Sequence, residues 1–176
     1  MVYVFLGDGF EEAEAICPVD ILRRCGVDVK TVSVMDDLLV KGAHNITVKA
    51  DIMINEIVHN ADMYILPGGT AGVENLSKCQ KLCKILSSTQ AEIAAICAAP
   101  TLLARLGLLK GKNAICYPSL TDELIGANVT HERVVTDGRI TTSMGPGTSF
   151  DFGFTIAMKF ADRTVVEQVR AGMLLK

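Results

Sequence analysis

The segment AEIAAICAAPTLLARLG, residues 91–107, places Cys97 between an apolar run and two alanines followed by Pro100. Such an apolar run is typical of a buried strand, and proline is favoured in the first turn of a helix. A thiol at a strand-to-helix turn lies near free backbone N–H groups and the positive end of a helix dipole, which lower its pKa. Because free cysteines are also among the most buried residues, Cys97 is either a nucleophile or a core side chain.

A nucleophilic thiol needs an acid or base beside it, and the segment FEEAEA supplies Glu11, Glu12 and Glu14 after the first apolar run. Each glutamate is equally suited to a solvated first turn of a helix, where the dipole favours negative charge. One of them could instead point inward, where burial would keep it protonated and able to donate a hydrogen bond to a thiolate. Spacing does not say which one does so.

Backbone groups are the other candidates for chemistry at Cys97. The PGG segment, residues 67–69, could present N–H groups to an oxyanion, or it could be a plain turn. The nucleophile elbow of serine hydrolases has the same strand–turn–helix geometry, but it places glycines around the nucleophile. The segment AICAAP departs from that pattern, so this motif alone does not decide the role of Cys97.

The remaining cysteines and the histidines carry weaker signals. Cys79 and Cys83 are four residues apart, and without a histidine near them we interpret them as half-buried thiols rather than metal ligands. The three histidines lie in polar segments with no obvious partner, which favours surface roles: His44, His59 and His131. No spacing of His, Asp or Glu matches a known ligand set, so we expect no metal site.

Alternating strand-like and helix-like segments must position these groups. The pattern predicts strands at 1–6, 27–35, 46–54, 63–66, 93–96 and 113–117, and helices at 11–25, 76–88, 100–106, within 145–160 and at 162–174. Pro18 should kink or interrupt the first helix, and Gly26 should end it. Asp137-Gly138 predicts a β-hairpin.

This alternation indicates an α/β fold with a mostly parallel sheet and helices on both faces. Sites in such sheets form at the carboxyl ends of the strands. We therefore expect GDGFEEAE, PGGTAG and CAAP to meet at one edge of the sheet.

Composition narrows the class of protein. The 176 residues are 49% hydrophobic, which suits one compact domain spanning residues 1–176. The net charge of −3, without a cluster of Lys and Arg longer than a pair, does not favour nucleic-acid binding. No run approaches the roughly 18 apolar residues of a membrane span, and the N-terminus lacks the pattern of a secretory signal. We expect a cytoplasmic protein that does not bind membranes.

Four blocks together resemble a known family: VFLGDGFEEAEAICPVDILRRCG, YILPGGTAGVENL, IAAICAAPTLLARLGLLKGK and TTSMGPGTSFDFGFTIA. They are similar, in order and spacing, to the ThiJ/PfpI family, in the branch of the Parkinson-disease-associated protein deglycase. The resemblance implies a flavodoxin-like sandwich of the class I glutamine amidotransferase type, usually a homodimer. It also implies a reactive Cys97 at a nucleophile elbow, Glu14 as its protonated partner, and backbone donors at Gly69 and Ala98.

Two functions follow from this resemblance. The first is a cofactor-independent glyoxalase or deglycase acting on methylglyoxal, glyoxal or their adducts, linked to oxidative-stress protection. The second is a non-catalytic redox sensor or stress-response binding protein whose Cys97 is oxidised to sulfinate. In the sensor, Cys116 at a neighbouring strand end is a candidate resolving thiol.

The chain departs from the family pattern around the expected pocket. Tyr117 stands before Pro118 where close relatives have a histidine, and a phenol with a pKa near 10 is a poor proton shuttle. Met144 and His44 replace two arginines, which makes the pocket less basic. The peptidase-like branch has a histidine after the cysteine, and Ala98 in that position disfavours a protease.

Overall fold

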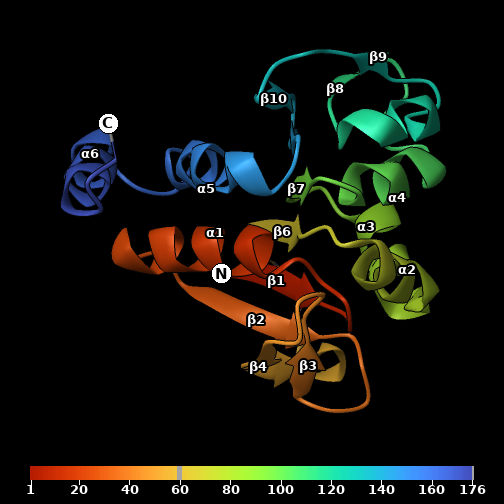
Figure 1. Ribbon diagram of the computed structural model, residues 1–176, viewed down its shortest axis with the longest axis horizontal. Helices are drawn as coiled ribbons and strands as arrows, with labels where there is room; N and C mark the ends of the chain where they lie inside the picture. Colours follow the sequence, from red (N-terminus) through yellow and green to blue (C-terminus); the bar gives the residue numbers. More distant parts are fainter. Residues whose placement is uncertain (59–60, 176) are drawn as a thin grey trace.

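The computed structural model describes residues 1–58 and 61–175. Its main sheet has seven strands, and every neighbouring pair is parallel except β10 and β11, which form an antiparallel edge (Figure 1). In spatial order the strands are β10 (Val134–Asp137), β11 (Ile140–Ser143), β7 (Glu92–Ile96), β6 (Met63–Leu66), β1 (Val2–Leu6), β2 (Val29–Ser33) and β5 (Ile52–Met53). The predicted α/β fold with a mostly parallel sheet is confirmed.

Two layers of helices cover the sheet, one on each face (Figure 1). One core includes Val2, Val4 and Leu6 of β1, and the other includes Tyr3 and Phe5. Because successive side chains of a strand point to opposite faces, β1 is buried on both sides, as a central parallel strand must be. The first core packs against α1 (Glu12–Arg24), α5 (Ser149–Ala157) and α6 (Arg163–Gly172), and the second against α2 (Thr70–Lys78), α3 (Gln80–Ser88) and α4 (Ala99–Arg105).

Two small sheets lie outside the main sheet. Strands β3 (Leu39–Lys41) and β4 (Thr47–Lys49) form an antiparallel hairpin, and β8 (Asn113–Ala114) pairs with β9 (Asn128–Val129). The hairpin predicted at Asp137-Gly138 is confirmed as β10–β11, with Gly138 at a φ of 60°.

The single strand predicted at 46–54 is wrong. The chain forms β4, bends, and then forms the two-residue strand β5 before a 3-10 turn at Ile54–Glu56. The bend is held by Asp51, whose carboxylate accepts hydrogen bonds from the Thr31 backbone at 2.7 Å and from Arg23 at 2.6 Å. These bonds come from α1 and β2, so the local pattern of residues 46–54 does not reveal the bend.

The helix predicted at 76–88 is also wrong in its limits. Helix α2 already begins at Thr70, and the chain is extended at Cys79 before α3 begins. The Cys83 thiol donates to the Ser77 carbonyl at 3.4 Å, which satisfies an acceptor left free where α2 ends. Helix α1, by contrast, continues through Pro18 and ends before Gly26, whose φ is 76°.

The strand predicted at 113–117 is shorter than expected, since β8 comprises only Asn113–Ala114. Among the described residues, no helix is both long enough and apolar enough to cross a bilayer.

Candidate active site

Cys97 lies between β7 and α4, at the carboxyl edge of the sheet. Its φ of 64° is in the left-handed region, which is unfavourable for a residue with a side chain. Two hydrogen bonds hold this conformation: the Cys97 N–H donates to the Ser143 carbonyl at 2.9 Å, and the Tyr117 N–H donates to the Cys97 carbonyl at 2.8 Å. The strained turn, fixed by two neighbouring segments, has the character of a nucleophile elbow.

Glu14 is the glutamate that the fold brings to Cys97. It is fully buried on α1, and its Oε2 accepts a hydrogen bond from the Gly68 N–H at 2.8 Å. A Cβ at position 68 would lie 2.5 Å from Glu14 Oε2 and 2.6 Å from Cys97 Cβ. Gly68 therefore lets the carboxyl and the thiol lie side by side, a requirement that the sequence alone did not predict.

Burial controls the protonation of this pair. Desolvation raises the pKa of Glu14 to about 7, against hydrogen bonds from Cys97 and the Gly68 N–H that lower it. Glu14 Oε1 is buried and has no hydrogen-bond partner among the described residues. An oxygen without a donor is better suited to a protonated carboxyl, which can donate its O–H to the thiolate.

The predicted lowering of the Cys97 pKa is wrong in direction. Burial, together with the negative charge and the hydrogen bond of Glu14, raises the pKa of the thiol to about 12, against backbone N–H groups of Gly69 and Ala98 that lower it. The pair thus releases one proton near pH 7, and above that pH the remaining proton lies mainly on the sulfur of Cys97. A thiolate forms in this range only when that proton passes to Glu14, since an ionised neighbour would repel it.

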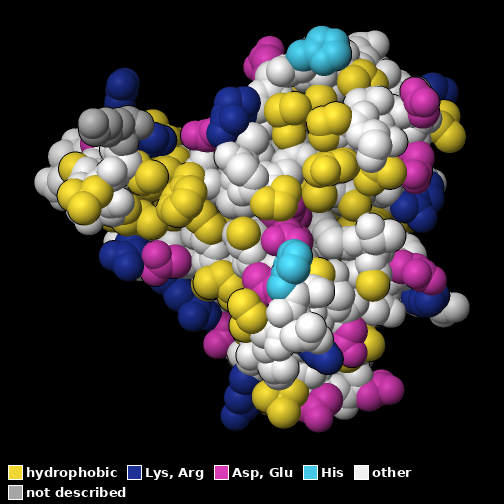
Figure 2. All heavy atoms as spheres, viewed as in Figure 1, with side chains coloured by type: hydrophobic (Ala, Val, Ile, Leu, Met, Phe, Trp, Pro, Cys, Tyr) yellow, Lys and Arg dark blue, Asp and Glu magenta, His cyan; other side chains and the backbone are white. Residues whose placement is uncertain are grey.

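An open cavity of about 420 Å³ gives access to Cys97. Glu14 is fully buried and does not line this cavity. The other predicted site residues do line it: Gly69, Cys97, Ala98, Tyr117 and His44. Near the β3–β4 hairpin, histidine and acidic side chains lie together on this face of the molecule (Figure 2). A small ligand can therefore reach the thiol.

His44 has partners, contrary to the sequence prediction. Its backbone N–H donates to Glu12 Oε1 at 2.7 Å, and its Nδ1 lies 2.9 Å from Glu12 Oε2 and 3.6 Å from Glu11 Oε2. The hydrogen bond to Glu12 and the charges of both glutamates raise the pKa of His44. His131 lies on the surface, and His59 is outside the described residues.

The side chains of Glu11, Glu12 and His44 are the candidate metal ligands among the described residues. Their ligating atoms lie within 4.8 Å of one another, a proximity that spacing in the sequence does not reveal. The charged hydrogen bonds between His44 and Glu12 account for the arrangement without an ion.

Tyr117 and Cys116 are neighbours in sequence but differ in exposure. Tyr117 is 45% exposed at the cavity. Cys116 is fully buried, and its thiol donates to the Tyr117 carbonyl at 3.4 Å. Cys116 packs in the core under α4, whereas Cys97 packs against the core under α1. A resolving role for Cys116 stays a prediction, and it would require this thiol to leave the core.

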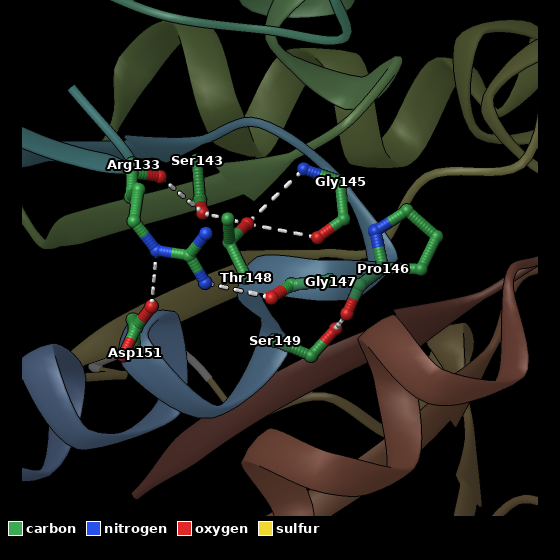
Figure 3. A network of polar contacts seen from close by, with 8 residues as sticks. All are labelled: Arg133, Ser143, Gly145, Pro146, Gly147, Thr148, Ser149 and Asp151. Atoms are coloured by element: carbon green, nitrogen blue, oxygen red, sulfur yellow. Dashed lines mark hydrogen bonds and ion pairs between the residues drawn. The ribbon is translucent and has the colours of Figure 1, made fainter.

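A polar network fixes the turn opposite Cys97 (Figure 3). Ser143 Oγ donates to the Arg133 carbonyl at 2.8 Å and lies 2.6 Å from Thr148 Oγ1, which accepts from the Gly145 N–H at 3.1 Å. A Cβ at Gly145 would lie 4.0 Å from Cys97 Sγ. The network thus holds one wall of the site.

Met144 lines a smaller neighbouring cavity together with Arg133 and Tyr117. The Arg133 guanidinium is engaged by Asp151 at 2.7 Å and by the Gly147 carbonyl at 2.8 Å (Figure 3). Arg133 is therefore not free to supply the positive charge of the arginine that Met144 replaces.

Comparison with known proteins identifies the family of the chain. The model of the DJ-1/PfpI family matches residues 1–159. The chain belongs to the DJ-1/PfpI family. This confirms the resemblance to the ThiJ/PfpI family that the four sequence blocks indicated.

Individual family members match nearly the whole chain. Protein dj-1beta of Drosophila melanogaster is 34% identical over 98% of this chain and 95% of its own length. Protein DJ-1 homolog B of Arabidopsis thaliana is 35% identical over 99% of this chain, which spans only 41% of that longer protein. A protein of Pyrococcus abyssi named as a deglycase is 32% identical over 83% of this chain and 90% of its own length.

Solved structures of the DJ-1/PfpI family have the same fold. Drosophila DJ-1beta matches with a TM-score of 0.95 at 33% identity, over 99% of this chain and 97% of that chain. Oxidized DJ-1 from Toxoplasma gondii matches with a TM-score of 0.94 at 31% identity and the same coverage. The DJ-1 fold of this chain is therefore shown both by sequence and by structure.

Proposed function

We propose that this DJ-1/PfpI family protein is a cofactor-independent enzyme of the glyoxalase or deglycase type. Its substrates are 2-oxoaldehydes such as methylglyoxal and glyoxal, or their adducts. The observation that carries the proposal is the buried Glu14 carboxyl beside the strained Cys97 at an open cavity. The name of the Pyrococcus abyssi relative, a deglycase, supports the same class of activity.

In the proposed reaction, the Cys97 thiolate adds to the aldehyde carbon of methylglyoxal and Glu14 protonates the resulting oxyanion, which gives a hemithioacetal. Glu14 then removes the hydrogen from this carbon and returns a proton to the neighbouring ketone carbon through an enediol. The aldehyde carbon is thereby oxidised to a thioester, and the ketone carbon is reduced to an alcohol. Water hydrolyses the thioester and releases lactate. One methylglyoxal and one water thus give one lactate, and the reaction needs no cofactor.

The backbone N–H groups of Gly69 and Ala98 have a second task in this scheme. They bond to the thiol in the resting site, where they stabilise negative charge on sulfur. Donors in this position are suited to hold the oxyanion that forms when sulfur attacks. Tyr117 and His44 complete the pocket, as a hydrogen-bond donor and a charged group at the rim.

The direct test is lactate release from methylglyoxal in the absence of glutathione. We expect the wild-type protein to produce lactate and Cys97→Ser to remain at the background rate. Cys116→Ser is the matched control, since this thiol is buried away from the cavity and its loss should preserve turnover. Equal background rates for the wild type and Cys97→Ser would contradict the proposal.

A redox-sensing role is the second candidate, favoured by the accessible Cys97 and by the relative solved in its oxidized state. Here a peroxide oxidises the Cys97 thiolate to sulfenate and then to sulfinate, with one water formed at each step. The protonated Glu14 would donate a hydrogen bond to the sulfinate. After mild peroxide treatment, intact mass should show a gain of two oxygens that maps to Cys97, and oxidation spread over several cysteines would count against this role.

Membership of the DJ-1/PfpI family also supports a proposal about the domain and subunit organisation of the protein. We propose that residues 1–176 form a single domain that assembles as a homodimer in the cytoplasm. Light scattering after size-exclusion chromatography should give twice the chain mass of 18.9 kDa.

A further inference from the structure

A second cavity adjoins the cavity of Cys97. It has a volume of about 230 Å³, and Thr70, Ala98 and Leu120 line both cavities. Both cavities are open to the surface, so a ligand that crosses this shared ridge can occupy the two at once. Methylglyoxal is much smaller than the roughly 300–1,000 Å³ typical of small-molecule sites, and it would leave the second cavity empty.

Two charged side chains on the wall of the second cavity have unused hydrogen-bonding capacity. The Arg105 guanidinium donates to Thr101 Oγ1 at 2.8 Å and to the Thr101 carbonyl at 3.3 Å, which leaves several of its N–H groups free. The nearest oxygen of Glu123 is 4.0 Å from Arg105 Nη2, beyond hydrogen-bond distance. Among the described residues, no group donates a hydrogen bond to the Glu123 carboxylate.

The third charge on this wall is already neutralised. Glu74 forms an ion pair with Lys78 at 2.7 Å on the surface of α2. The two remaining charges on this wall, Arg105 and Glu123, come from different segments and form a loose ion pair at 4.0 Å, in which each keeps hydrogen-bonding groups free for a ligand. A ligand with one negative and one positive group close together would complement both.

We propose that this second cavity binds the zwitterionic group of a free α-amino acid. The α-carboxylate accepts hydrogen bonds from Arg105, and the α-ammonium donates to Glu123. This proposal rests on the proposed function. It assigns the substrate as the adduct of a 2-oxoaldehyde with a free amino acid such as cysteine. The former aldehyde carbon of the adduct would lie at Cys97. A glycated side chain within a protein lacks the free zwitterion and would not use this site.

Binding measurements on the Cys97→Ser protein test the proposal without requiring turnover. The probe is S-(2-hydroxypropyl)-L-cysteine, a stable thioether with a free zwitterion. Its N-acetyl derivative keeps only the carboxylate, and its methyl ester keeps only the ammonium. Because both protein groups are about half exposed, we expect the zwitterion to bind about fivefold more tightly than either derivative in isothermal titration calorimetry.

Substitutions locate the effect. Arg105→Gln and Glu123→Gln, each added to Cys97→Ser, should abolish the preference for the zwitterion, whereas Arg24→Gln on the distant α1 should preserve it. Equal binding of the three compounds, or a preference that survives both substitutions, would overturn the proposal. A wild-type protein that forms no lactate from methylglyoxal would refute the proposed activity instead, and the binding result would still decide whether the zwitterion site exists.

Discussion

Cys97 and Cys116 are the same residue type at the ends of two neighbouring segments, yet their surroundings differ. Burial raises the pKa of both thiols, to about 12 for Cys97 and to about 11 for Cys116. Only Cys97 has a carboxyl beside it that holds a proton near neutral pH, together with backbone donors and an open cavity. The difference shows that neighbouring groups, rather than the cysteine itself, make one thiol suited to chemistry.

The largest expected effect comes from removing the acidic proton beside Cys97. Glu14→Gln keeps the shape of the side chain but cannot release and recover a proton, so lactate formation should fall about 10²–10⁴-fold. Glu167→Gln on α6 is the matched control and should retain wild-type turnover. If Glu14→Gln also retains it, the contrast between the two cysteines does not depend on the carboxyl.

Separating the pair sterically is the next test. Gly68→Ala introduces a Cβ that Glu14 and Cys97 leave no room for, so we expect turnover to fall about 10²-fold through misplacement of the two groups. Gly172→Ala serves as the control, because a Cβ there meets nothing within 4 Å. Circular dichroism of both variants should separate a misplaced site from a misfolded chain.

The stability of the fold should depend on pH through Glu14. The pKa of this carboxyl is raised from 4.5 to about 7 in the folded state, so the folded chain binds more protons than the unfolded chain in this range. The free energy of unfolding should therefore fall as pH rises from 4.5 to 7, by up to about 3 kcal/mol. Urea denaturation at several pH values should show this slope for the wild type and lose it in Glu14→Gln.

The reactivity of the two thiols should also respond differently to pH. Because the Glu14–Cys97 pair releases its first proton near pH 7, alkylation of Cys97 by iodoacetamide should increase nearly tenfold per pH unit below 7 and then level off. Cys116 should remain unmodified in the folded protein. Peptide mapping by mass spectrometry measures both sites, and parallel modification of the two would contradict the assigned difference.

The smallest effect concerns the rim of the cavity. His44→Asn removes the charged contact with Glu12, and we expect a two- to threefold change in KM because exposed ion pairs contribute little. The pKa of His44 is raised, so its charge is present below that pKa and lost above it. The KM values of the wild type and the variant should accordingly converge at high pH.

Short-range sequence patterns specify the elements around Cys97. The apolar run of β7, the small residues after it and Pro100 at the start of α4 specify a strand, a turn and a helix through neighbouring residues alone. The alternation of strands and helices likewise predicted the parallel sheet, and Asp137-Gly138 predicted the hairpin. These features are readable because backbone propensity and hydrophobic period act over a few residues.

Which groups meet depends on how segments far apart in the chain pack together. Glu11, Glu12 and Glu14 are equivalent by spacing, and the packing of α1 on the sheet buries Glu14 against Gly68 and turns the other two toward His44. The raised pKa of the Cys97 thiol has the same origin, since desolvation and the charge of Glu14 outweigh the local backbone donors. Burial and charge are sums over segments far apart in the chain, so no local pattern of residues contains them.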